Sequence, residues 1–222
     1  EYAIVRSLVG SEMCIRDSLD RLQEILNKNK SDAKIIAKIE NQEGLDNIDE
    51  ICKSSWGVMV ARGDLGIETS LTDLPNIQRR IMYACGKWGK RSIVATHLLE
   101  SMISNPTPTR AEASDVANAI YEGADAIMLS GETSIGKYPI ECVNFLKLIS
   151  AKTEKFNTLG YEKNLISHSD WQHIGISAKH LAEATNADGI IAITRTGETA
   201  NLVSNAKPCL LYTSDAADEK YR

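Results

Sequence analysis

The sequence has no long apolar run and no cluster of basic residues, and each absence excludes a class of partner. Its longest apolar runs are strand-sized, far short of the roughly 20 residues that a transmembrane helix needs, so we expect no membrane partner. Residues 1–18 begin with Glu1 and are interrupted by charged side chains, which is not the pattern of a signal peptide. Lys and Arg are scattered and the net charge is −5, so we expect no nucleic-acid partner.

The sequence also lacks paired cysteines. Its five cysteines are an odd number, lie far apart and form no C-x-x-C pair. This pattern fits neither a disulfide framework nor a zinc site. We expect most of them to be small apolar side chains on helices, and we expect a reducing, cytoplasmic location.

What the sequence does contain is a regular alternation of short apolar strands and amphipathic helices. Near-continuous apolar runs of this kind suit a parallel sheet that is covered on both faces. Five such runs are predicted as strands: 34–39 (KIIAKI), 57–61 (GVMVA), 92–96 (SIVAT), 126–130 (AIMLS) and 189–194 (GIIAIT).

Helical periodicity fills the intervals between these runs. Residues 74–88 carry apolar side chains at helical spacing and are followed by Gly89, a common helix end. A capping box of Thr109 and Glu112 predicts a helix over 109–121, and Pro139 is placed for a first helical turn. Residues 172–186 form another amphipathic stretch.

The spacing of the strands indicates the fold class. Starts at 34, 57, 92 and 126 lie 23, 35 and 34 residues apart, the rhythm of βα units. An eight-stranded barrel needs about 250 residues. We therefore predict an α/β protein: a partial (β/α)8 TIM-type barrel of about four βα units over 19–157, a linker over 158–170, and the start of a second α/β domain over 171–208.

Charged, hydroxyl and glycine residues gather at the ends of the first four predicted strands. They are Lys38, Glu40 and Asn41 at the first, Arg62, Gly63 and Asp64 at the second, Thr96 and Glu100 at the third, and Ser130, Gly131, Glu132 and Thr133 at the fourth. In parallel α/β folds, functional groups collect where strands end. Taken singly, each is a solvated turn residue more often than a catalyst, but four consecutive strand ends behaving alike indicate a site.

Within this set, Glu40 and Asp64 suit a hard divalent cation such as Mg²⁺, which takes one or two carboxylates. Lys38 lies two residues before Glu40 and so points to the same side of the strand, where it could neutralise a transferring phosphoryl group. Gly63 lets the backbone approach a ligand closely, so the amides near Asp64 could bind a carboxylate.

Three further polar residues have structural alternatives. Arg62 could equally be an ion-pair partner, and we expect Arg110 and Asp115 to be structural or interfacial. His97 alone among the four histidines lies next to the predicted site, and we expect none of the four to bind a metal.

Five collinear segments resemble pyruvate kinase motifs in their usual order: KIIAKIEN (34–41), VMVARGDLGIE (58–68), ATHLLESM (95–102), NPTPTRAEASDVANA (105–119) and IMLSGET (127–133). The resemblance runs from about Leu19 to Pro208. It implies phosphoryl transfer from phosphoenolpyruvate to ADP, giving pyruvate and ATP in glycolysis, with Mg²⁺ (or Mn²⁺) and usually K⁺.

The resemblance also implies roles for single residues. Glu40 and Asp64 would bind the metal, and Lys38 would stabilise the phosphoryl group in flight. Gly63, Asp64 and Thr96 would hold the substrate carboxylate, and Thr96, Ser130 and Glu132 would line the side from which the enolate is protonated. Arg62 would help shape the site, and residues 105–119 would lie at a contact of the family's homotetramer.

This chain departs from the family in several places. His97 stands where the family usually has Gln, a change that we expect to be tolerated. The K⁺ ligands, the phosphate-binding arginine and much of the nucleotide site belong to segments that this chain does not contain. Residues 194–199 (TRTGET) fall where some relatives bind a sugar-phosphate effector, but Glu198 would repel a phosphate. Residues 1–18 and 209–222 do not resemble the family, and we expect them to be non-native terminal segments.

Three functions follow from the sequence. The first is a pyruvate kinase fragment that shows no turnover on its own. The second is a metal-dependent lyase or aldolase on a related pyruvate-binding barrel, which would share the carboxylate pair but need no ADP. The third is a non-catalytic truncated chain that binds full-length subunits.

Overall fold

The computed structural model describes residues 15–167, 169–194 and 196–208, with side chains from Ser18 onward. The chain divides into two compact units after Tyr161, and each unit is described by itself. The division falls within residues 158–170, where we expect a linker. The domain boundaries themselves remain predictions.

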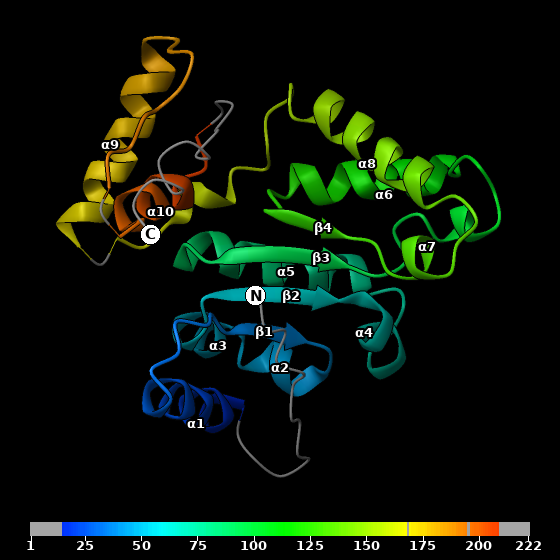
Figure 1. The fold of residues 1–222 in the computed structure, drawn as a ribbon, viewed down its shortest axis with the longest axis horizontal. Coiled ribbons are helices and arrows are strands. Elements are labelled where there is room, and N and C mark those ends of the chain that lie inside the picture. The colour runs from blue at the N-terminus through cyan, green and yellow to red at the C-terminus, as the bar shows by residue number, and fades with distance from the viewer. Residues whose placement is uncertain (1–14, 168, 195, 209–222) are drawn as a thin grey trace. The chain divides into compact units, whose positions relative to one another are not determined.

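The first unit is built on a four-stranded parallel sheet in the order β1-β2-β3-β4. The strands are β1 (Ile36–Ile39), β2 (Gly57–Ala61), β3 (Arg91–Ala95) and β4 (Ala126–Met128). Lys38 is in register with Met59, Val60 with Val94, and Ala95 with Met128, so neighbouring strands end within one residue of each other. Figure 1 shows the four arrows side by side and pointing the same way. This sheet confirms the predicted fold class, a partial TIM-type barrel.

Only one face of this sheet is fully covered by the described residues. Side chains at alternate positions, among them Ile39, Val58 and Val94, are buried in the core beneath the helices. On the other face Ile36 is 40% exposed. The expectation that both faces are covered is therefore not met. In a closed barrel the inner face is covered by side chains from the strands on the opposite side, whereas the described residues form a sheet of four strands only.

Helix α1 (Ile15–Lys28) precedes β1, and further helices follow each strand of the first unit. They are α2 (Gln42–Asp46), α3 (Ile48–Ser54), α4 (Arg62–Glu68), α5 (Leu74–Trp88), α6 (Arg110–Tyr121), α7 (Gly131–Ser134) and α8 (Pro139–Thr153), with one 3-10 turn, η1 (Glu100–Ile103). A second 3-10 turn, η2 (Tyr161–Asn164), begins at the last residue of this unit. Helix α5 packs on β2 and β3, and α6 packs on α8. The short helices α2, α4 and α7 lie at the arrowhead end of the sheet (Figure 1).

Local sequence explains the ends of the longer helices. Helix α5 ends at Gly89, whose φ of 59° places it in the left-handed region that glycine adopts without strain. Helix α6 begins with the predicted capping box, in which Thr109 and Glu112 bond each other's backbone amides. Pro139 lies in the first turn of α8, where its missing N–H costs nothing.

The second unit contains α9 (Asp170–Ala184) and α10 (Glu198–Asn205), which pack on each other. Gly175 is needed at their contact, since a Cβ there would meet the backbone oxygen of Leu202 at 3.0 Å. The predicted strand over 189–194 is wrong: these residues form no strand. Ile191 is 94% exposed, and the described residues of this unit offer no neighbouring strand to pair with the segment.

Three cysteines lie in the described residues, and all three are buried on helices: Cys52, Cys85 and Cys142. This agrees with the expected role as small apolar side chains. Cys14 and Cys209, like the predicted terminal segments outside 15–208, lie beyond the residues described. Among the described helices, none is long and apolar enough to cross a membrane.

Candidate active site at the carboxyl edge of the sheet

The four strands end at one edge of the parallel sheet. The residues that follow them, from Lys38 at the end of β1 to Ser130 after β4, are thereby brought to a common edge. Three groups of contacts occupy this edge: one around Lys38, one around Arg62 and one around Glu132.

The first group is a lysine between two carboxylates. The Lys38 ammonium lies 2.5 Å from a carboxylate oxygen of Glu40 and 2.8 Å from one of Asp64. The hydrogen bond to Asp64, followed by the one to Glu40, raises the pKa of Lys38 above its ordinary value of 10.5. Lys38 therefore remains a cation at neutral pH. The three side chains are partly exposed, so solutes can reach them.

The same geometry fits a divalent metal ion. Glu40 and Asp64 come from neighbouring strand ends and converge on one cationic nitrogen, so both can reach a single cation placed near it. Their oxygens are the ligand type that Mg²⁺ takes, usually one or two carboxylates completed by water and substrate. The described residues hold no group of three or more His, Cys, Asp or Glu arranged as a metal site.

Next to this cluster, a hydrogen bond between Gly63 and Thr96 connects the segments that follow β2 and β3. The Gly63 amide donates to the Thr96 hydroxyl oxygen at 2.8 Å, and that hydroxyl donates to the Ala95 carbonyl at 2.6 Å. Thr96 has φ of 70° and His97 has φ of 55°. Two successive non-glycine residues in the left-handed region are rare, and for a β-branched residue such as Thr the conformation is strained.

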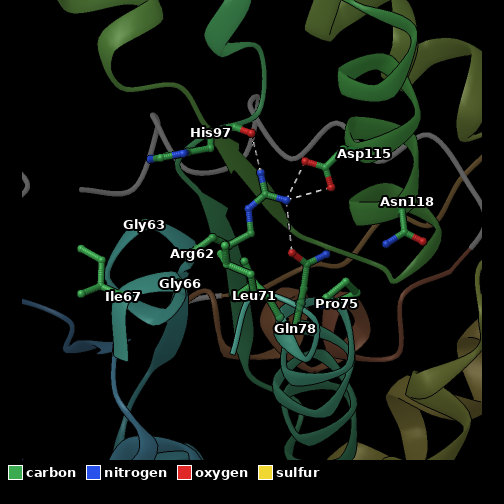
Figure 2. A pocket seen from close by; sticks show the side chains of 11 residues that line it. Arg62, Gly63, Gly66, Ile67, Leu71, Pro75, Gln78, His97, Asp115 and Asn118 are labelled. Atoms are coloured by element: carbon green, nitrogen blue, oxygen red, sulfur yellow. Dashed lines mark hydrogen bonds and ion pairs between the residues drawn. The ribbon is translucent and has the colours of Figure 1, made fainter. Parts of the chain in front are cut away.

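The second group is a buried arginine that holds this strained turn. The Arg62 guanidinium donates to the Thr96 carbonyl at 2.7 and 3.1 Å and to the His97 carbonyl at 3.0 Å. One of its terminal nitrogens lies 2.8 and 2.7 Å from the two carboxylate oxygens of Asp115. Figure 2 shows the guanidinium between His97, Asp115 and Gln78. Arg62 is only 8% exposed, so these contacts are largely removed from water.

A further layer of buried polar contacts lies behind Arg62. Gln78 accepts from Arg62 at 3.5 Å and donates to Glu122 at 2.8 Å. Asn118 and Arg79 also donate to the Glu122 carboxylate. On the open side of Arg62 lies a cavity of about 460 Å³, lined by polar residues of this network and by apolar residues of α4, α5 and the segment between them (Figure 2).

The third group joins the ends of β3 and β4. The Glu132 carboxylate accepts from the Leu99 amide at 3.1 Å and from the Ser130 amide at 2.8 Å, and its side chain is buried. The Ser130 carbonyl accepts from the Ser134 amide at 3.1 Å and so starts α7. In this arrangement Glu132 ties two loops together, whereas its predicted role rests on the resemblance alone.

The structure thus links most of the predicted site residues directly. Lys38, Glu40 and Asp64 form one cluster, and Gly63, Thr96 and Arg62 form a second that is joined to it through the neighbouring residues 63 and 64. The Glu132 carboxylate contacts both Ser130 and Leu99. We expect Asp115 to be structural or interfacial, and the structure pairs it with Arg62, 53 residues away, a pair that no local spacing indicates.

His97 lies beside this second cluster and lines the cavity. Its imidazole nitrogen Nδ1 is 3.2 Å from a carboxylate oxygen of Glu100, and both side chains are exposed. Its backbone carbonyl, rather than its side chain, contacts Arg62. An exchange of side chain at this position therefore leaves the contacts of the turn with Arg62 in place.

Comparison with known proteins gives one consistent result. The family model "Pyruvate kinase, barrel domain" matches residues 9–143. The chain is 45% identical over 196 residues to a pyruvate kinase of Staphylococcus epidermidis (strain ATCC 35984), covering 86% of this chain and 33% of that protein. It is 46% identical over 194 residues to the pyruvate kinase of Bacillus licheniformis, covering 84% of this chain and 33% of that protein.

A solved structure agrees with the sequence comparisons. The crystal structure of a pyruvate kinase from Cryptosporidium parvum superposes with a TM-score of 0.83 at 38% identity, covering 88% of this chain and 42% of that chain. The chain spans about a third of the length of the curated relatives it matches. With the family model matching well over half of the residues, and with this fold and strand-end site, the chain belongs to the pyruvate kinase family.

Proposed function

We propose that this chain supplies the metal-binding and carboxylate-binding part of a pyruvate kinase site, for phosphoryl transfer from phosphoenolpyruvate to ADP in glycolysis, giving pyruvate and ATP. The observation that carries the proposal is the convergence of Glu40 and Asp64 on the Lys38 ammonium, at 2.5 and 2.8 Å. A lysine and two carboxylates at one strand edge suit a substrate that carries both a metal ion and an anionic group.

In this proposal Glu40 and Asp64 hold Mg²⁺ or Mn²⁺. The ion, when bound, would supply positive charge that polarises the oxygens of the substrate. Lys38 remains protonated and lies within reach of the same region, where it offsets the negative charge that develops on the transferring phosphoryl group.

The substrate carboxylate lies against Gly63, Asp64 and Thr96. The Gly63 amide donates to the Thr96 hydroxyl oxygen at 2.8 Å, so both groups are already next to each other. A bound carboxylate exchanges this internal bond for its own bonds to the amide and the hydroxyl. Backbone amides fixed before binding lose little entropy when the ligand arrives, which favours this position for the carboxylate.

Arg62, Ser130 and Glu132 complete the proposed site. Arg62 holds the Thr96–His97 turn, and Glu132 holds the Ser130 loop. Thr96 and Ser130 then line the side from which the enolate receives its proton. Buried Glu132 contributes by fixing the Ser130 and Leu99 amides.

Several properties belong to the whole protein rather than to these residues. We propose that the full-length protein works in the cytoplasm as a homotetramer with K⁺, and that the K⁺ ligands and most of the ADP site lie outside this chain. We expect no ATP formation from phosphoenolpyruvate and ADP by the isolated chain in a luciferase assay. Turnover in that assay would contradict this expectation.

Titration of Mn²⁺ tests the metal site directly. Electron paramagnetic resonance counts free Mn²⁺, and we expect the chain to bind one ion more tightly than its variants Glu40→Gln and Asp64→Asn, each by about tenfold or more, since each removes one of two charged ligands. Glu154→Gln, an exposed residue after α8, is the matched control and should leave binding unchanged. Equal affinity in all four proteins would reject the site.

The two alternative functions make different predictions. A lyase or aldolase would cleave a carbon–carbon bond of an oxo acid with the same metal, and the three relatives described above, each named pyruvate kinase, give it no support. A binding partner would form a complex with full-length subunits in sedimentation experiments, whether or not it binds Mn²⁺. That role remains a prediction.

A further inference from the structure

The turn after β3 stores conformational strain at the candidate site. Thr96 and His97 both have positive φ, 70° and 55°, although neither is glycine. Such conformations persist only where surrounding contacts determine them. The Thr96 hydroxyl that accepts from the Gly63 amide depends on this conformation, since the side chain leaves the backbone at the strained residue.

Arg62 supplies contacts that hold both strained residues. Within the part of the chain that the structure describes, its guanidinium donates to the carbonyl oxygens of Thr96 and His97 and to no other backbone group. A rotation of either residue toward negative φ would move these carbonyls away from the planar donors. The guanidinium thus selects the strained conformation.

Asp115 in turn fixes the guanidinium. Both of its carboxylate oxygens lie within 2.8 Å of one Arg62 nitrogen, whereas the Gln78 side-chain oxygen lies 3.5 Å from the same nitrogen. Charge-assisted bonds of this kind are about twice as strong as neutral ones. Asp115 lies on α6, so it connects the turn to a helix that packs outside the sheet.

We infer that Asp115 is a positioning residue of the candidate site: acting through Arg62, it holds Thr96 and His97 in the left-handed conformation and so keeps the Thr96 hydroxyl against the Gly63 amide. That this positioning matters for substrate binding rests on the proposed function. The positioning itself is independent of it, because it concerns a backbone conformation.

Amide hydrogen exchange of the full chain, followed by NMR, tests this inference. The Gly63 amide is bonded to Thr96, so it reports on the turn, and the Val60 amide, in buried β2, reports on the stability of the sheet. Asp115→Asn should raise the exchange rate of Gly63 relative to Val60 about tenfold, because it removes the charge-assisted bonds. Asp115→Glu should restore much of the protection.

The matched control is Asp49→Asn, which makes the same change of charge at an ion pair with Lys87 that has no contact with the turn. It should leave the ratio of the two rates unchanged. A ratio within about twofold of the original in Asp115→Asn would overturn the inference. A purely structural role of Asp115 would accelerate both amides together and would likewise overturn it.

A second variant covers the case in which Asp115→Asn fails to fold. Glycine adopts positive φ freely, so His97→Gly removes part of the strain that Arg62 has to hold. The double variant His97→Gly/Asp115→Asn should then recover a dispersed spectrum, and a double variant that remains unfolded would overturn the inference. Mn²⁺ titration of the unsubstituted chain separates the two proposals: failure to bind Mn²⁺ counts against the function, whereas an unchanged exchange ratio counts against the positioning role alone.

Discussion

The two halves of the candidate site are held together in opposite ways. Lys38, Glu40 and Asp64 are partly exposed and contact one another through ion pairs between flexible side chains. Arg62 is buried and bonds to the backbone of Thr96 and His97 and to the fixed carboxylate of Asp115. The contacts of the first half are open to solvent and can be replaced by contacts to a ligand, whereas those of the second half are buried and fixed.

This difference matches the roles proposed for the two halves. Groups that bind a metal ion and an anionic substrate must give up their internal contacts when the ligand arrives, so weak, exposed ion pairs suit them. Groups that set the shape of the turn must keep their contacts, and burial makes those contacts costly to break. Substitutions in the two halves should therefore differ in their effect on stability.

The largest loss of stability is expected from Arg62→Ala. It leaves the carbonyls of Thr96 and His97 without their donor and the Asp115 carboxylate without its cation, and breaking a buried pair costs about 3–5 kcal/mol. The free energy of unfolding from urea denaturation measures this. Arg80→Ala, at an exposed position of the neighbouring helix α5, is the control and should change it by less than about 0.5 kcal/mol. If Arg62→Ala lost no more stability than Arg80→Ala, the buried contacts of Arg62 would not hold this half of the site in place.

The next largest loss is expected from Glu132→Ala. The substitution leaves the Leu99 and Ser130 amides without an acceptor in a buried place, which costs at least about 2 kcal/mol in the free energy of unfolding. Glu132→Gln keeps one acceptor oxygen and should lose less. Glu24→Ala, exposed on α1, serves as the control. If Glu132→Ala proved as stable as the control, Glu132 would not hold the two loops together.

Much of this architecture was predictable because local patterns encode it. The strand over 57–61 and the helix over 74–88 have the predicted bounds, since apolar runs and helix-ending glycines act within a few residues. The run over 189–194 has the same apolar pattern as 57–61 but forms no strand. A strand requires a neighbour, and the sequence of the run does not say whether one is present.

The candidate site was predictable only in part. Strand-end position identified Lys38, Glu40 and Asp64 as one group, because parallel strands end at the same edge. The pairing of Arg62 with Asp115 joins residues that are 53 apart, and the positive φ of Thr96 is set by those contacts rather than by its own preference. Burial of Glu132 likewise depends on the packing of two loops. No single-sequence pattern carries such information.

A smaller effect on the free energy of unfolding is expected when low pH protonates Glu112, in the first turn of α6. Burial opposes ionisation of Glu112, but hydrogen bonds from Ser101 and Thr109 outweigh it and lower the pKa of the carboxyl below its ordinary value of 4.5. Its contribution to stability is complete above the ordinary pKa and is lost as the pH falls through the lower, folded-state pKa. Urea denaturation from pH 6 to pH 3 should show Glu112→Gln losing about 1 kcal/mol less than the unsubstituted chain. If the free energy of unfolding depended equally on pH in Glu112→Gln and in the unsubstituted chain, Glu112 would make no such contribution.

The smallest change in stability is expected from Lys38→Met, in the exposed half of the site. Ion pairs between exposed side chains contribute about 0–1 kcal/mol, so the free energy of unfolding should barely change. Mn²⁺ affinity should instead increase, because the ammonium that lies between Glu40 and Asp64 no longer opposes an incoming cation. A unit charge about 4 Å away in water corresponds to about 1 kcal/mol, or roughly fivefold in affinity. If Lys38→Met bound Mn²⁺ more weakly, Lys38 would order the two carboxylates rather than compete with the metal. Both halves of the site would then be held by fixed contacts, and the contrast between them would be lost.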